Sequence, residues 1–279
     1  MNKKLRIKAC TALAAMALCL PTARAKDRPS RLPLLVIGAS YSEGKTPFNN
    51  GVAPLGGMSV GLGSYLALGQ ALTRSELLPG HVINEAQGGS GTFARPYCAP
   101  GAASCGPAGW ESYQTQLEKA LARVAVPPAF ASHNARYLVV TMPNDCLHAD
   151  AFGIAQSLSQ PCTPAQMNAS VDRMVALGQS ALARGITPIF DVHPRYRQLN
   201  LPLFRDLSGL AWVIGEADYN TLRELMRTRL KAELPQAIVL DMWKELEHIG
   251  DGIHPDAATV KRAARAIAQE LIRRDGHRP

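Results

Sequence analysis

Short apolar runs alternate with longer amphipathic stretches along most of the chain. Five runs have the length and composition of buried parallel strands: residues 34–37, 81–84, 137–141, 186–191 and 237–241. Apolar positions at helical spacing predict five helices, over residues 59–74, 111–124, 164–184, 217–234 and 256–274. This alternation is typical of a parallel sheet with helices on both faces.

The first apolar run ends abruptly at Gly38, and Ser40 follows two residues later. Ligands of open α/β sheets bind beyond the carboxyl ends of the strands, so Ser40 lies where chemistry is usually done. Gly and Ser are also common in ordinary turns. This stretch alone therefore leaves the role of Ser40 open.

A second candidate lies more than two hundred residues further on, where Asp251 precedes His254 by three positions. In a turn, this spacing lets the carboxylate accept a hydrogen bond from one ring nitrogen while the other nitrogen faces a hydroxyl. Such a pair is the base and orienting group of nucleophilic catalysis. The sequence therefore predicts that His254 and Asp251 activate Ser40.

Four segments in order along the chain carry a resemblance to the SGNH hydrolases, the GDSL esterase family. They are Gly38-Ala39-Ser40, residues 84–89, Met142-Pro143-Asn144-Asp145, and Asp251-Gly252-Ile253-His254-Pro255. The resemblance implies a three-layer α/β/α sandwich around a flavodoxin-like, parallel, five-stranded sheet. Two positions depart from the family pattern: Ala39 replaces an Asp, and Met142 replaces a Gly.

The resemblance also implies an ester hydrolase with a Ser-His-Asp triad. The oxyanion would be held by the backbone N–H groups of Ser40 and Gly89 and by the Asn144 side chain. No metal and no cofactor are implied. His193 and Met142 are candidate pocket residues, and a structural role is the alternative for His193.

The N-terminus has the pattern of a secretory signal peptide. Basic residues precede an apolar segment, residues 9–20, and the small-residue pattern Ala23-Arg24-Ala25 predicts cleavage after Ala25. Removing residues 1–25 takes away five basic and no acidic residues, so the formal net charge falls from +8 to +3. We expect a periplasmic or secreted protein without a stable membrane anchor, and no nucleic-acid partner.

Four cysteines remain after cleavage, and an even count in an exported chain favours disulfides. We expect the pairs Cys98–Cys105 and Cys146–Cys162, within irregular insertions near residues 93–110 and 145–162. A metal site at Cys146 and His148 is the alternative, but it lacks a Cys-x-x-Cys partner.

The mature chain, residues 26–279, has the length of a single α/β domain. A third insertion, near residues 194–217, is rich in apolar side chains. It either forms a lid over Ser40 or packs onto the core. The expected partner is a small-molecule or glycan ester, with acyl chains and acetyl groups both open.

Three other functions compete with the esterase. The first is transfer of acyl groups to an extracellular or wall glycan, and the second is glycan binding by a noncatalytic relative. Residues 39–46 also resemble a phosphate-binding loop with Lys45, which would make the protein a nucleotide binder. Pro47 directly after this loop argues against the helix that such a site needs.

Overall fold

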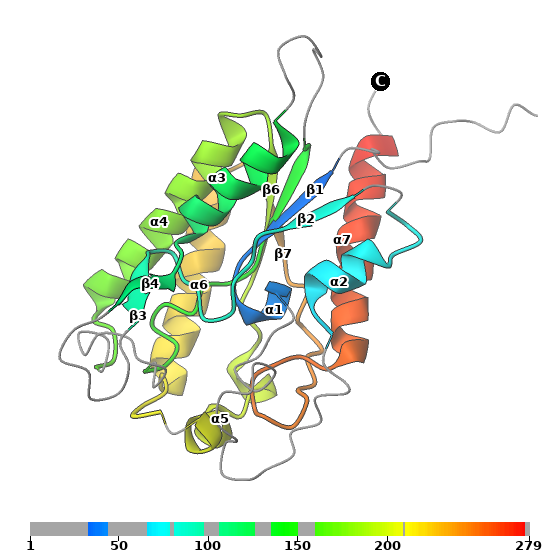
Figure 1. The fold of residues 1–279 in the computed structure, drawn as a ribbon. Helices are drawn as coiled ribbons and strands as arrows, with labels where there is room; N and C mark the ends of the chain where they lie inside the picture. The colour runs from blue at the N-terminus through cyan, green and yellow to red at the C-terminus, as the bar shows by residue number, and fades with distance from the viewer. Residues whose placement is uncertain are drawn as a thin grey trace, which may run out of the picture.

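A computed structural model provides the fold and describes residues 33–43, 66–78, 81–97, 106–125, 135–149, 160–208 and 210–276. Its centre is a five-stranded parallel sheet in the order β2-β1-β5-β6-β7 (Figure 1). The strands are β1 (Leu34–Ile37), β2 (Val82–Asn84), β5 (Tyr137–Val140), β6 (Thr187–Asp191) and β7 (Ile238–Leu240). This is the flavodoxin-like order that the resemblance implies, and the predicted fold is confirmed.

The apolar runs form the middle of the core. Every residue of β1 and β5 is buried, as expected for central strands that are covered on both faces. The five predicted strands are all present, each within two residues of its predicted ends.

Helices cover both faces of the sheet. One face carries α3 (Tyr113–Val124), α4 (Pro164–Leu182) and α6 (Glu216–Glu233), and the other carries α2 (Leu68–Thr73) and α7 (Ala257–Gly276) (Figure 1). Local sequence sets the helix starts. Thr163 forms a capping box with Gln166, and Pro164 occupies the first turn of α4. None of the helices in the described part of the chain has the length and apolarity to span a bilayer.

Two predictions about the elements differ from the described structure. The helix predicted over 59–74 is not continuous: α2 begins at Leu68, because Ala67 has extended backbone angles and serves as its N-cap, and residues 59–65 lie outside the described residues. The described ends of the insertion near 93–110 are regular: β3 (Arg95–Tyr97) and β4 (Gly106–Trp110) form an antiparallel pair. Strands made largely of Gly, Pro and Ala lack the alternation of apolar and polar residues that marks a strand in a sequence.

The insertion near 194–217 packs onto the core. It contains the 3-10 helix η4 (Tyr196–Gln198) and the helix α5 (Leu201–Ser208), and its buried apolar side chains are Leu201, Phe204, Leu207, Leu210 and Ile214. Backbone bonds join it to the segment after β5: Ala149 donates to the Trp212 carbonyl at 3.0 Å, and Ile214 donates to that of Leu147 at 2.9 Å. These contacts favour the packing interpretation over a lid.

Candidate active site

Ser40 is the first residue of α1 (Ser40–Glu43), a short helix at the carboxyl end of β1 (Figure 1). The turn that presents it requires glycine at position 38. Gly38 has φ +141°, and a Cβ on this residue would collide with Oγ1 of Thr141 at the end of β5. The close approach of the β1 and β5 ends thus fixes the backbone just before Ser40.

The Gln116 side chain of α3 is hydrogen-bonded to this turn on both sides of Gly38. Its Oε1 accepts a hydrogen bond from the Gly38 N–H at 2.8 Å, and its Nε2 donates to the Gly38 carbonyl at 3.1 Å. Gln116 is fully buried, so both bonds are shielded from water. The sequence interpretation missed Gln116. The only available signal was an amide on the buried face of a predicted helix.

His254 and Asp251 form the predicted hydrogen-bonded chain with Ser40. His254 Nε2 lies 2.8 Å from Ser40 Oγ, and His254 Nδ1 lies 2.5 Å from Asp251 Oδ2. All three residues are at most 8% exposed. The structure thus joins residues that are 214 positions apart in the sequence.

The spacing of the pair follows from the turn. Asp251 Oδ1 accepts the backbone N–H groups of Ile253 at 3.0 Å and of His254 at 2.9 Å, which leaves Oδ2 for the ring. Burial opposes the charged form of Asp251. The adjacent His254 and these hydrogen bonds outweigh burial and lower the pKa of Asp251 below its usual value. A charged Asp251 can fix the ring orientation and stabilise a protonated imidazole.

Residues outside the Asp251–His254 turn stabilise it through hydrogen bonds to its backbone. His248 Nδ1 accepts the N–H groups of Gly250 at 3.1 Å and Gly252 at 3.3 Å. Gly252 has φ +91°, and its carbonyl accepts the N–H of Asn200 at 2.7 Å. His248 is half-buried, and these bonds support the Asp251 turn.

Two rings contact His254. Phe204 of α5 packs edge-on against the imidazole at a centroid distance of 6.0 Å, and Tyr41 lies at the same distance. The Tyr41 hydroxyl also donates to the Ile253 carbonyl. α5 therefore contacts His254 through the buried Phe204 and does not form an exposed cover.

Gly89 lies in the loop after β2 with φ +85°, and a Cβ there would collide with the Trp110 indole. The backbone of the preceding residue, Gly88, is hydrogen-bonded on both sides. Glu43 Oε2 accepts the Gly88 N–H at 2.5 Å, and Trp110 Nε1 donates to the Gly88 carbonyl at 2.7 Å. The Arg95 guanidinium donates to the Gly89 carbonyl. Contacts from α1, β3 and β4 thus orient the predicted oxyanion donor.

Asn144 follows β5 and is half-buried. Next to it, the buried Asp145 accepts the Thr92 N–H at 2.9 Å and the Ser170 hydroxyl at 2.9 Å. These bonds anchor the third segment to the loop after β2 and to α4. Met142 is 5% exposed, and its carbonyl accepts the Tyr113 hydroxyl at 2.9 Å.

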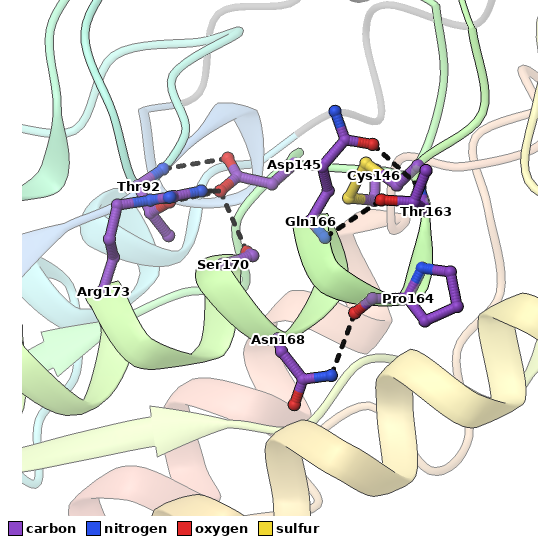
Figure 2. Close-up of a disulfide and its surroundings, with 10 residues drawn as sticks. Thr92, Asp145, Cys146, Thr163, Pro164, Gln166, Asn168, Ser170 and Arg173 are labelled. Atoms are coloured by element: carbon purple, nitrogen blue, oxygen red, sulfur yellow. Dashed lines mark hydrogen bonds and ion pairs between the residues drawn. A yellow bond between two sulfur atoms is a disulfide. The ribbon is translucent and has the colours of Figure 1, made fainter.

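The predicted disulfide Cys146–Cys162 is present, and it ties the turn after Asn144 to the start of α4 (Figure 2). Cys146 has φ +64°, in the left-handed region that residues other than glycine seldom adopt. The predicted pair Cys98–Cys105 and the residue Lys45 both lie outside the described residues, as does the signal peptide.

A cavity of about 220 Å³ adjoins the site and is lined in part by Asn144. Neither His193 nor Met142 lines it. His193 is 1% exposed, and burial lowers its pKa to about 4, so the ring is neutral at physiological pH. Within the described ranges, no group of three or more His, Cys, Asp or Glu residues is placed to hold a metal ion.

Comparison with known proteins gives similarity in structure only. No protein-family model matches the chain, and no curated protein matches its sequence. Est24, a carbohydrate acetylesterase from Sinorhizobium meliloti, is 17% identical with a TM-score of 0.54, over 86% of this chain and 98% of Est24.

Two further solved structures are similar to the same extent. The inhibitor-bound aryl esterase of M. smegmatis is 15% identical with a TM-score of 0.53, over 86% of this chain and 98% of the esterase. A carbohydrate acetylesterase family member from Sinorhizobium meliloti is 17% identical with a TM-score of 0.51, over 86% and 99%. At these identities the likeness establishes a shared fold, and the activity has to be argued from the site.

Proposed function

We propose that the protein is an exported serine esterase, which hydrolyses carboxylic esters through an acyl-enzyme formed on Ser40. The observation that carries this proposal is the buried hydrogen-bonded chain from Asp251 through His254 to Ser40. A nucleophile, its base and the group that orients the base are thus already within hydrogen-bonding distance of one another.

In the first half-reaction, Ser40 Oγ attacks the ester carbonyl and its proton passes to His254 Nε2, 2.8 Å away. The charged Asp251 stabilises the resulting imidazolium. When the tetrahedral intermediate collapses, the C–O bond to the alcohol breaks, and His254 returns the proton to the leaving oxygen. The acyl group then remains on Ser40.

In the second half-reaction, His254 takes a proton from water as the water oxygen attacks the acyl carbonyl. The bond to Ser40 Oγ breaks, the serine regains its proton from His254, and the acid leaves. The N–H groups of Ser40 and Gly89 and the Asn144 amide are the proposed donors to the oxyanion. Loss of one such donor typically costs on the order of 100- to 1,000-fold in rate.

Export and substrate class are part of the same proposal. The signal pattern at the N-terminus and the Cys146–Cys162 bond support an oxidising compartment. Structural neighbours described as carbohydrate acetylesterases and as an aryl esterase support short acyl or acetyl esters. Mass spectrometry of the exported protein tests the first point: a chain that starts at Lys26 is expected, and an intact Met1 contradicts export by this signal.

Labelling with a fluorophosphonate tests the nucleophile without knowledge of the natural substrate. Wild type should be labelled and should hydrolyse short activated esters, whereas Ser40→Ala should do neither, because no nucleophile remains. Ser180→Ala, on α4, is a matched control and should behave as wild type. Full labelling of Ser40→Ala would end the assignment of the nucleophile.

The same assay separates the competing functions. Lys45→Ala should keep its labelling and turnover if Ser40 acts as a nucleophile. Nucleotide binding that is lost in Lys45→Ala would favour a phosphate-binding loop, and absence of both labelling and turnover in wild type would favour a noncatalytic binding protein. An acceptor glycan that carries the acyl group away faster than water would indicate an acyltransferase.

A further inference from the structure

The cavity beside Asn144 lies between the third segment, the start of α4 and the insertion that carries Trp212. Its wall includes the Cys146–Cys162 bond and Gln166, which Figure 2 shows next to one another, together with Arg95 and Arg173. It opens beside the proposed oxyanion site, because Asn144 belongs to both. A group bound there would be part of the ester substrate or of its leaving alcohol.

Arg95 is a buried cation without an anionic partner in the described part of the chain. It is 6% exposed, and no carboxylate of the described residues lies within 4.0 Å of it. Its guanidinium donates to the Gly89 carbonyl, and its Nε is shielded from solvent without a hydrogen-bond partner among the described residues. An unpaired buried charge is costly, so this arrangement is typical of a site whose counter-charge is a ligand.

Asp145, a carboxylate that lines the cavity, does not neutralise Arg95, because its ion pair is with a second cation, Arg173. Asp145 Oδ2 lies 3.3 Å from Arg173 Nη2 and also accepts the Ser170 and Thr92 hydroxyls (Figure 2). The remaining Asp145 oxygen accepts the Thr92 N–H at 2.9 Å. Asp145 thus already accepts hydrogen bonds on both oxygens, and among the described residues that line the cavity one positive charge stays unbalanced.

The other polar groups of the wall add further donors. The Trp212 indole N–H is shielded from solvent, and no residue in the described ranges accepts a hydrogen bond from it. Trp212, Arg95 and Asn144 all line one cavity. A carboxylate matches the Arg95 side chain, because a planar anion with two acceptor oxygens pairs with a guanidinium through two parallel hydrogen bonds.

We propose that this cavity binds a carboxylate of the substrate, so that the preferred substrates are esters with a negative charge close to the scissile bond. The inference rests on the proposed esterase function and narrows its substrate class. The charge is either on the acyl part, as in a hemisuccinate, or on the alcohol part, as in an acetylated uronic acid. A carboxylate on either part of the ester could accept hydrogen bonds from the same cavity residues.

Two substrate pairs of closely similar shape test the proposal and separate the two sources. The acyl pair is 4-nitrophenyl hemisuccinate and 4-nitrophenyl butyrate. The alcohol pair is a mono-O-acetylated methyl glucuronoside and the corresponding methyl glucoside. The measured quantity is the ratio of kcat/KM for the charged ester to that for the neutral ester, in wild type, Arg95→Gln and Arg173→Gln. Arg184→Gln, an exposed arginine just after α4, is the matched control.

In wild type, one pair should show a ratio of about 10 to 100, the range expected for a hydrogen-bonded ion pair. The ratio should fall to about 1 in Arg95→Gln, fall partly in Arg173→Gln and stay unchanged in Arg184→Gln. If Arg95 only positions the Gly89 carbonyl, its loss lowers kcat for both esters equally and leaves the ratio unchanged. Ratios near 1 for both pairs in wild type overturn the proposal and leave the esterase intact.

A binding measurement separates failure of the cavity from failure of the esterase. Sodium glucuronate or succinate should raise the melting temperature of wild type more than glucose at equal ionic strength, and this difference should vanish in Arg95→Gln. The same shift without hydrolysis of any ester would refute the esterase and keep the anion site. Absence of the shift together with unselective hydrolysis would refute the anion site alone.

Discussion

Asp191, at the end of β6, is a buried carboxylic acid whose protonation should make the stability of the fold depend on pH. It is 3% exposed, and the Trp243 indole donates to its Oδ2 at 2.6 Å. Burial raises the pKa of Asp191 from 3.8 to about 7, and the hydrogen bond from Trp243 only partly offsets this rise. We predict that Asp191→Asn, which keeps an oxygen for Trp243 but cannot ionise, removes this pH dependence.

The sign and size follow from proton binding. The folded protein holds the Asp191 proton more tightly than the unfolded chain does. The stabilisation is therefore complete below pH 3.8 and is lost as the pH rises through about 7. At about 1.36 kcal/mol per pKa unit, the loss approaches 4 kcal/mol in order of magnitude.

The assay is urea denaturation of wild type and Asp191→Asn at intervals from pH 4 to pH 8. The difference in free energy of unfolding between the variant and wild type cancels the other titrating groups. It should rise with pH by up to about 4 kcal/mol in favour of Asp191→Asn. A difference that stays constant within about 1 kcal/mol over this range would refute the reasoning. Trp243→Phe removes a bond that lowers the pKa, so it should move the transition to higher pH.

Three further predictions concern the site. Asp251→Asn should lower kcat for an activated ester on the order of 10,000-fold, because the ring loses its orienting anion; a loss below 10-fold in steady-state kinetics would contradict this role. Gln116→Leu leaves the Gly38 N–H and carbonyl without hydrogen bonds, so the free energy of unfolding should fall by about 1–3 kcal/mol for each group and fluorophosphonate labelling should slow. Unchanged urea denaturation and labelling would show that Gln116 does not position the Gly38 turn. The double variant Cys146→Ser and Cys162→Ser opens a loop with a sequence separation of 16, so its free energy of unfolding should fall by about 3 kcal/mol; equal urea midpoints and slopes for the variant and wild type would refute this.

The sheet and its helices were predictable because the signals are local. Continuous apolar runs mark the buried strands, and apolar positions at helical spacing mark the covering helices. The strand order came from the resemblance alone, since periodicity says nothing about which strands are neighbours. The pair β3 and β4 escaped prediction because its Gly, Pro and Ala residues carry no period.

Ser40, His254 and Asp251 were found in the sequence because each stands where a chemical rule can be applied to its neighbours. The residues that hold them could not be found in this way. Gln116 reaches Gly38 from 78 positions away. Arg95 belongs to a strand that the sequence did not reveal, and its lack of a carboxylate partner among the described residues is visible only in the folded structure.

The two departures from the family pattern have different physical consequences. Ala39 removes a carboxylate after Gly38, but the turn is held by Gln116 on Gly38 and by the bond from Ser42 Oγ to Thr141 Oγ1 at 2.9 Å. Neutral amide and hydroxyl groups thus position the turn before Ser40, and Ala39 adds no charged group that would need a counter-charge. Met142 is buried with its carbonyl bonded to Tyr113, so it fills the space behind the third segment and leaves the cavity wall to Asn144 and the arginines. We therefore expect substrate choice to depend on charge at Arg95 more than on the shape of the pocket floor.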